Sequence, residues 1–192
     1  GLAVDEDIER VLLLHEKYGN KINIRVDANQ GYTLSKLTKF INATEKIGLQ
    51  LIEQPLPVGK ETDLLLLDQQ KRNKLAADES LHNAKAAIEL ASVNHPFGIY
   101  NIKLMKCGGI LGAREIANIA KPAGISLFWG CNDESIISIT AALHVAYSCP
   151  HTQYLDLDGS FDLAEDMVKG GFEIKNGLLT TNKQPGLGFD WI

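Results

Sequence analysis

Three acidic residues recur at nearly equal intervals along the chain and could share one task. Asp27, Glu53 and Asp78 each end a short apolar segment, and successive members are 26 and 25 residues apart. Three carboxylates that meet in a partly buried place repel one another and lose solvation unless a cation holds them. Oxygen ligands suit a hard divalent ion, so the pattern predicts a Mg²⁺ site, with Mn²⁺ as second choice. A single such aspartate is more often a helix cap or a surface charge, but the repetition favours the metal.

A lysine continues the same series. Lys103 ends the apolar segment 100–103, 25 residues after Asp78. A lysine beside a metal and an apolar wall has a lowered pKa and acts as a base. The alternative is a salt-bridge partner that neutralises the carboxylates, and the residues alone leave both open.

Two further acids end the last apolar segment, residues 153–158. Asp156 and Asp158 are two residues apart, so on a strand they point to the same face,. Such a pair would suit a cationic group such as an ammonium, whereas the alternative is two loop aspartates that cap a turn. Glu134 closely follows the apolar segment 126–130, and its role stays open.

The elements that position these residues alternate between strand and helix. Short apolar segments bounded by turn residues predict buried strands, and the patterns between them have helical spacing. A period of about 25 residues predicts βα units and a parallel sheet, either doubly wound or closed as a (β/α)₈ barrel. The barrel is favoured, because it gathers the charged strand ends at one mouth. The expected strands are 22–27, 49–53, 74–78, 100–103, 126–130 and 153–158, and the expected helices are 5–18, 34–44, 84–91, 113–120 and 133–148.

The predicted fold class is therefore α/β, a partial TIM-type barrel with about six of the eight strands. A helix opens the chain with no strand ahead of it, so we expect a fragment or a complementing chain that supplies the missing strands. Residues 1–160 would form the partial barrel. Residues 161–192 would form a C-terminal segment associated with a missing capping domain, with a hairpin that turns at Asn176-Gly177,.

Composition sets the broad class of protein. The chain has 192 residues, 45% hydrophobic and 22% charged, with a formal net charge of −5. These values are ordinary for a cored globular protein, and they favour neither nucleic acid nor an anionic membrane as partner. Three cysteines are few and odd in number, which is typical of reduced thiols and predicts a cytoplasmic protein,.

Four sequence motifs surround the charged strand ends. They are Val-Asp-Ala-Asn-Gln-Gly-Tyr (26–32), Ile-Glu-Gln-Pro (52–55), Ala-Asp-Glu-Ser (77–80) and Asn-Ile-Lys-Leu-Met-Lys-Cys-Gly-Gly (101–109). In this order and spacing they resemble the muconate-lactonising-enzyme-like subgroup of the enolase superfamily. The resemblance covers nearly the whole chain, and the pair Asp156 and Asp158 is similar to the Asp-x-Asp of its dipeptide epimerases of the L-Ala-D/L-Glu type.

The resemblance implies a Mg²⁺-dependent isomerase that epimerises a dipeptide through an enediolate. Asp27, Glu53 and Asp78 would ligate the ion, and Lys103 would be the acid/base on one face of the α-carbon. The pair at 156 and 158 would hold the α-ammonium. Two further residues, Asn29 and Glu79, would support the metal ligands from the next layer.

The chain departs from this family in one respect. The Lys-x-Lys motif that supplies the base for the opposite face, and the capping domain that selects the substrate, would both lie upstream. The fragment alone is therefore expected to be impaired. Alternatives are another subgroup member, such as a cycloisomerase or an o-succinylbenzoate synthase, a Schiff-base lyase using Lys103, or an inactive barrel fragment. A homo-oligomer is the expected assembly, since open sheet edges invite association.

Overall fold

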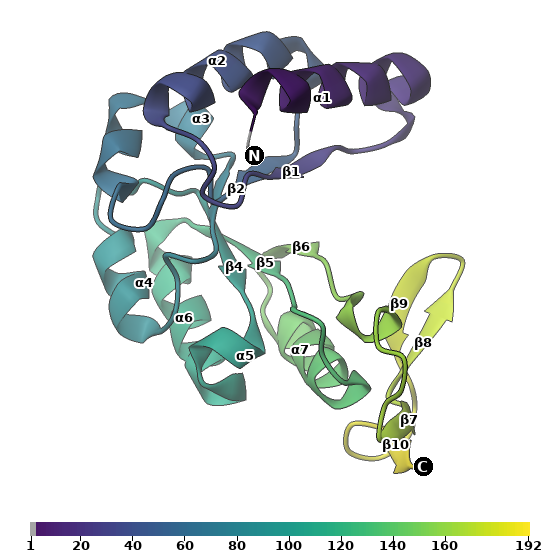
Figure 1. Ribbon diagram of the computed structural model, residues 1–192. Coiled ribbons are helices and arrows are strands. Elements are labelled where there is room, and N and C mark those ends of the chain that lie inside the picture. Colours follow the sequence, from purple (N-terminus) through teal and green to yellow (C-terminus); the bar gives the residue numbers. More distant parts are fainter. Residues whose placement is uncertain (1–2) are drawn as a thin grey trace. The chain divides into compact units, whose positions relative to one another are not determined.

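The computed structural model describes residues 3–192 and is mixed α/β (Figure 1). Its largest sheet has six strands in sequential order, β1-β2-β3-β4-β5-β6. The pairs β1–β2, β2–β3, β3–β4 and β5–β6 are parallel. These strands are β1 (Arg25–Asp27), β2 (Leu51–Glu53), β3 (Leu75–Ala77), β4 (Ile99–Ile102), β5 (Ser126–Trp129) and β6 (Thr152–Leu155).

Helices separate consecutive strands of this sheet, as the period of 25 residues predicts. The alternation and the strand order confirm the predicted fold class, a partial (β/α) barrel with six strands. The α-helices are α1 (Val4–Tyr18), α2 (Leu34–Thr44), α3 (Gln69–Arg72), α4 (Ala84–Leu90), α5 (Leu104–Cys107), α6 (Gly109–Ala123) and α7 (Ile136–Ser148), and the 3₁₀ helices are η1 (Gly19–Lys21), η2 (Glu45–Ile47), η3 (Glu61–Leu66) and η4 (Gly159–Phe161).

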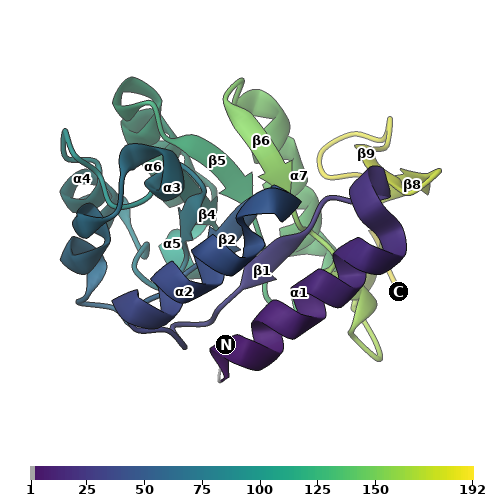
Figure 2. The ribbon, with the colours of Figure 1, turned by 90° about the horizontal axis from the view of Figure 1, so that it is seen from above.

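The chain divides into two compact units, and each is described by itself. The first comprises residues 1–81 and 89–100. In it, α1 and α2 lie side by side on the same side of β1 and β2 (Figure 2). Leu37 and Phe40 of α2 are fully buried, as are Leu51 of β2 and Leu75 of β3. Burial of this apolar surface is the main favourable contribution to folding of the unit.

The second unit comprises residues 82–88 and 101–192. Its central helix, α7, is apolar on nearly all sides, and Ile139 and Leu143 are almost fully buried. Trp129 of β5 is fully buried and donates from Nε1 to Thr152 Oγ1 of β6 at 2.9 Å. This bond satisfies the one polar atom of the indole and fixes β6 beside β5.

The C-terminal region does not continue the βα alternation, and it packs against α7. The predicted hairpin is confirmed, with Asn176 (φ 53°) and Gly177 (φ 77°) both left-handed at its turn, as a type I′ turn requires,. A strand that the sequence analysis did not predict begins at Phe189. The strands here are β7 (Val168–Gly170), β8 (Phe172–Lys175), β9 (Leu178–Thr181) and β10 (Phe189–Trp191), with β10 antiparallel to β7.

The predicted strands are too long at their ends. Asp156 and Asp158 lie beyond the last residue of β6, Leu155, and Asp78 lies one residue beyond β3. Gly48 and Gly124 are left-handed C-caps, at the ends of η2 and α6,. Within residues 3–192, no helix is long and apolar enough to cross a membrane.

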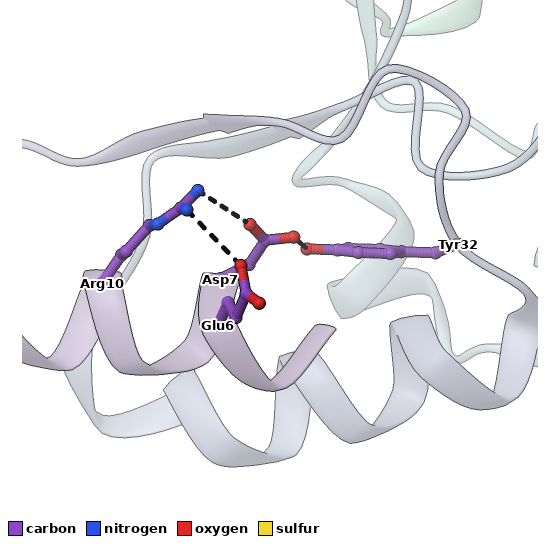
Figure 3. Close-up of polar contacts among 4 residues, drawn as sticks. All are labelled: Glu6, Asp7, Arg10 and Tyr32. Carbon is purple, nitrogen blue, oxygen red and sulfur yellow. Dashed lines mark hydrogen bonds and ion pairs between the residues drawn. The ribbon is translucent and has the colours of Figure 1, made fainter. Parts of the chain in front are cut away.

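A buried tyrosine joins α1 to the loop that follows β1 (Figure 3). Tyr32 is 1% exposed, and its hydroxyl donates to Asp7 Oδ2 at 2.7 Å. Asp7 Oδ1 also lies 3.8 Å from Nη1 of the exposed Arg10, with which it forms an ion pair. Burial, and then the bond to Asp7 and its negative charge, raise the pKa of Tyr32, so the phenol stays a neutral donor,. The first unit thus ties its first helix to the loop that carries Asn29.

Removing this hydroxyl is expected to destabilise the first unit. Tyr32→Phe would leave the Asp7 carboxylate without its donor, so we expect a loss of about 1–2 kcal/mol in the free energy of unfolding, measured by urea titration. Tyr147→Phe is the matched control, because that exposed hydroxyl makes only a 3.4 Å contact with the Leu179 carbonyl oxygen. Equal effects of the two substitutions would show that the Tyr32–Asp7 bond contributes no stability.

Candidate active site

The three acids predicted as metal ligands all belong to the first unit and lie at the carboxyl ends of adjacent strands. Asp27 is the last residue of β1, Glu53 the last residue of β2, and Asp78 directly follows β3. Asp27 is exposed, whereas Glu53 is 7% and Asp78 6% exposed. Two nearly buried carboxylates at neighbouring strand ends carry a desolvation penalty that a cation would relieve.

The strand register aligns two of these acids with each other and with the residue two positions before the third. Asp27 is the parallel partner of Glu53, and Glu53 is the partner of Ala76. Partners in a parallel pair point to the same face, and side chains along a strand alternate. Asp78 lies one residue beyond the end of β3, and continued alternation would return it to the face of Glu53,.

Backbone hydrogen bonds continue past the strand ends and hold the acid-bearing loops together. Ala28 N–H donates to Glu53 O at 3.0 Å, and Gln30 N–H donates to Gln54 O at 2.7 Å. Gln54 N–H donates in turn to Ala76 O at 2.9 Å. The carboxylates consequently extend from an ordered rim rather than from loose loops.

The side chain of Gln54 fills the space between the second and third strand ends. It is fully buried, and Oε1 accepts from Asp78 N–H at 3.0 Å and from Ser80 N–H at 3.2 Å. Nε2 donates to Leu56 O at 3.0 Å and to Ser80 Oγ at 2.8 Å. All four hydrogen-bonding positions of the amide are therefore used.

Ser80 connects the side chain of Gln54 to Glu61. Its Oγ donates to Glu61 Oε1 at 2.7 Å, and Gly59 N–H donates to the same oxygen at 2.9 Å. Burial alone would raise the pKa of Glu61, but the hydrogen bonds from Ser80 and Gly59 outweigh it and hold that pKa below its ordinary value,. Glu61 is thus an ionised acceptor at neutral pH, and it orients the serine hydroxyl.

The two residues expected to support the metal ligands have different environments. Asn29 is exposed with a left-handed φ of 46°, and its N–H donates to Asp27 Oδ1 at 2.8 Å, which fixes the Asp27 carboxylate. Glu79 accepts from Gln30 Nε2 at 3.0 Å through Oε1. Within residues 3–192, its buried Oε2 has no hydrogen-bond partner.

The remaining predicted residues belong to the second unit. Lys103 directly follows β4 and occupies the N-cap position of α5, where it is half-buried. Asp156 and Asp158 follow β6 and are exposed, and Asp156 N–H donates to Trp129 O at 2.9 Å. Lys103 thus stands at a strand carboxyl end, as expected, whereas Asp156 and Asp158 lie in the loop after β6 and not on the predicted strand.

The loop of Asp156 and Asp158 is joined to the end of β5 by Cys131. Its thiol lies 3.3 Å from the Asp156 carbonyl oxygen and 3.9 Å from Asp158 Oδ1, and Gly159 N–H donates to Sγ at 3.3 Å. Burial first, and then the charges of Asp158, Glu134 and Asp156, raise the pKa of Cys131 to about 11, although the Gly159 bond opposes them,. The thiol is therefore neutral at physiological pH.

Glu134, whose role the sequence left open, holds the turn before α7. It is 4% exposed, Oε1 accepts from Asn132 N–H at 2.9 Å, and Oε2 accepts from Ser138 Oγ. Asp166 completes this helix start, because its carboxylate accepts from Ile136 N–H at 2.7 Å,. Glu134 thus stabilises the turn that precedes α7 and the first turn of that helix.

Comparison with known proteins gives the family. The whole chain, residues 1–192, matches the family described as enolase C-terminal domain-like. The chain belongs to this family. An L-Lys-D/L-Arg epimerase from Desulforapulum autotrophicum is 52% identical over 98% of this chain and 53% of its own length. An L-Lys-D/L-Arg epimerase from Methylococcus capsulatus is 50% identical over 96% of this chain and 52% of its own length.

Solved structures agree with the family assignment. A dipeptide epimerase from Methylococcus capsulatus, complexed with a Mg ion, has a TM-score of 0.94 at 48% identity, over 98% of this chain and 55% of that one. A dipeptide epimerase from Enterococcus faecalis, complexed with Mg and L-Leu-L-Tyr, has a TM-score of 0.87 at 36% identity, over 98% of this chain and 54% of that one. The chain thus spans about half the length of the relatives it matches.

The donor set of this family member fits a hard divalent ion. All three candidate ligands are carboxylates, the preferred donors of Mg²⁺, and they stand at or directly after the carboxyl ends of three adjacent strands,. As placed in residues 3–192, however, side chains form no group of three or more His, Cys, Asp or Glu residues that could hold a metal ion. Joint ligation by Asp27, Glu53 and Asp78 therefore stays a prediction.

Sequence reasoning missed the residues that hold the acids in place, above all Gln54 and Ser80. Both stand in the motifs 52–55 and 77–80, beside predicted ligands, and that proximity is the one signal available. Their interactions join side chain to backbone across two strands, which no local pattern encodes. The same holds for the Cys131 thiol, which the sequence indicated only as a reduced cysteine.

The raised pKa of Cys131 predicts that its thiol is alkylated slowly at neutral pH and that the rate depends on the charge of Asp158. Because the thiolate reacts, alkylation by iodoacetamide should rise about tenfold per pH unit up to roughly pH 10, measured by mass spectrometry of the Cys131 peptide. N-acetylcysteine is the control and levels off at about pH 9, near the ordinary pKa of a free thiol. Asp158→Asn removes a nearby negative charge and should lower the pKa. A rate for Cys131 that levels off together with the control would contradict the prediction.

Proposed function

We propose that the protein carrying this chain is a Mg²⁺-dependent dipeptide epimerase. The observation that supports this most directly is the register of β1, β2 and β3, which pairs Asp27 with Glu53 and Glu53 with Ala76, two residues before Asp78. The proposal is also supported by relatives at 52% and 50% identity that are L-Lys-D/L-Arg epimerases. An epimerase of this kind needs a cation, a proton carrier and a group that orients the substrate.

Asp27, Glu53 and Asp78 are the proposed ligands, and Mn²⁺ is expected to replace Mg²⁺ because both prefer oxygen donors. When bound, the ion supplies fixed positive charge beside the substrate carboxylate and makes the α-proton more acidic. Asn29 contributes by holding the Asp27 carboxylate through its backbone N–H. Glu79 is proposed to support the site from the loop after β3.

Lys103 is the proposed acid/base. It stands at the carboxyl end of β4, and its half-buried position suits an amine that exchanges a proton with the α-carbon,. Epimerisation removes a proton from one face and returns one to the other. Lys103 serves one face, and we expect the second group from residues outside this chain, in keeping with its coverage of about half of each relative.

Asp156 and Asp158 are proposed to hold the α-ammonium of the dipeptide. The substrate is expected to carry cationic side chains, because relatives named L-Ala-D/L-Glu epimerases are only 33% and 31% identical. This differs from the Ala-Glu type that the motifs resemble. Chloromuconate cycloisomerases match at 32–33% identity, so a cycloisomerase is the alternative. Activity on a muconate instead of a dipeptide would favour it.

The proton-transfer role predicts a selective loss on substitution of Lys103. Lys103→Ala in the complete protein should lower the rate of epimerisation of L-Lys-L-Arg by about 10²-fold or more, followed by polarimetry, because inversion needs a proton carrier on each face. Binding of Mn²⁺ should stay within about twofold, since the carboxylates remain. Lys106→Ala, in the last turn of α5, is the control and should retain epimerisation. Full epimerisation by Lys103→Ala would exclude this lysine as the acid/base.

The ammonium-binding role predicts a change in substrate use. Asp158→Asn should lower kcat/KM for L-Lys-L-Arg by about tenfold, because a charge-assisted hydrogen bond to the ammonium is weakened. Wild-type protein should turn over L-Lys-L-Arg faster than L-Ala-L-Glu in a polarimetric assay. Unchanged kcat/KM in the variant, or a preference for L-Ala-L-Glu, would contradict the assigned role or the assigned substrate.

A further inference from the structure

Gln54 contacts every strand end that carries a predicted ligand. Its backbone oxygen accepts from Gln30 N–H in the loop after β1, and its N–H donates to Ala76 O of β3. Its side chain accepts from the N–H groups of Asp78 and Ser80. One residue, directly after Glu53, therefore connects the ends of all three strands.

The amide of Gln54 is fixed in a single orientation. Both bonds to Oε1 come from backbone N–H groups, which only donate, and Leu56 O near Nε2 only accepts. A flipped amide would place its NH₂ against two donors and its oxygen against a carbonyl. Since the side chain is fully buried, an unsatisfied arrangement would be costly,.

The backbone of Gln54 also departs from ordinary geometry. Its φ is 29°, on the left-handed side that residues other than glycine rarely adopt,. Such a conformation persists where surrounding contacts over-determine it. The four side-chain and two backbone hydrogen bonds of Gln54 provide those contacts. With this turn, Glu53 ends β2 while the amide of Gln54 bonds to the loop that follows β3.

We propose that Gln54 is a positioning residue for the cation site, whose buried amide fixes the backbone of Asp78 relative to Glu53. This rests on the proposed function, in which those two acids are ligands. Residues that orient ligands from the next layer typically change metal affinity by 10–100-fold when removed. Gln54 accepts a hydrogen bond from the backbone N–H of Asp78, so it fixes the position of the Asp78 carboxylate. Gln54 itself is not a ligand.

The test measures Mn²⁺ affinity and stability separately in the complete protein. Gln54→Met keeps the length of the side chain and removes all four hydrogen bonds. We expect Mn²⁺ binding, followed by the EPR signal of the free ion, to weaken about tenfold or more. Ser80→Ala removes one acceptor from Gln54 Nε2, so we expect a smaller loss of affinity in the same direction. Thermal melting without metal gives the stability of each variant.

Arg72→Met is the matched control. Arg72 is 4% exposed, lies before β3 in the same unit, and makes four hydrogen bonds to the residues Leu67, Asn94 and His95. Its loss should lower the melting temperature, yet Mn²⁺ affinity should stay within about twofold because it is remote from the strand carboxyl ends. Equal loss of affinity in Arg72→Met and Gln54→Met, at equal loss of stability, would overturn the positioning role.

Two further results separate this proposal from the proposed function. Asp78→Asn and Glu53→Gln should each weaken Mn²⁺ binding strongly if the acids are ligands. Wild-type affinity in both acid variants would refute the metal site itself, and the positioning role with it. Weak binding in the acid variants with wild-type binding in Gln54→Met, or in Ser80→Ala if Gln54→Met does not fold, would refute only the positioning role.

Discussion

The structure of the candidate site depends on hydrogen bonding between adjacent parallel strands, continued past their carboxyl ends. Parallel pairing aligns Asp27 with Glu53 and Glu53 with Ala76, and the bonds from Ala28, Gln30 and Gln54 extend that pairing into the loops. A shift of one residue in any pair would turn an acid to the opposite face. The carboxylates can therefore bind one cation together only if this register is kept.

Buried polar networks stabilise this arrangement where apolar packing ends. The amide of Gln54 and the hydroxyl of Ser80 satisfy backbone groups that a loop at a strand end would otherwise leave unpaired,. The ionised Glu61 accepts the last bond of this chain of contacts. In the second unit Glu134 and Asp166 serve the start of α7, and Cys131 joins the ends of β5 and β6. Both units thus use side chains to fix loops at strand carboxyl ends.

Much of the fold could be predicted from the sequence, because it follows from local periodicity. Helix 5–18 agrees with α1, the six apolar segments agree with six strands, and Asn176-Gly177 forms the expected hairpin turn. Strand ends were predicted less well, since Asp156 and Asp158 lie beyond β6. The end of this strand is set by pairing, because Leu155 is the partner of Trp129 at the end of β5. The apolar segment in the sequence continues past that point. β10 at Phe189 was missed because its pairing with β7 is non-local.

The sequence by itself singled out the candidate residues, since the types and spacing of Asp27, Glu53, Asp78 and Lys103 are local facts, and its motifs identified the family. Only the tertiary structure decided how the acids are held. Gln54 is an ordinary glutamine in the sequence, and the folded chain brings its amide to the backbone of Asp78, 24 residues away. Hydrogen bonds between side chains and distant backbone depend on strand register and on the path of the loops, and neither leaves a periodic trace in the sequence.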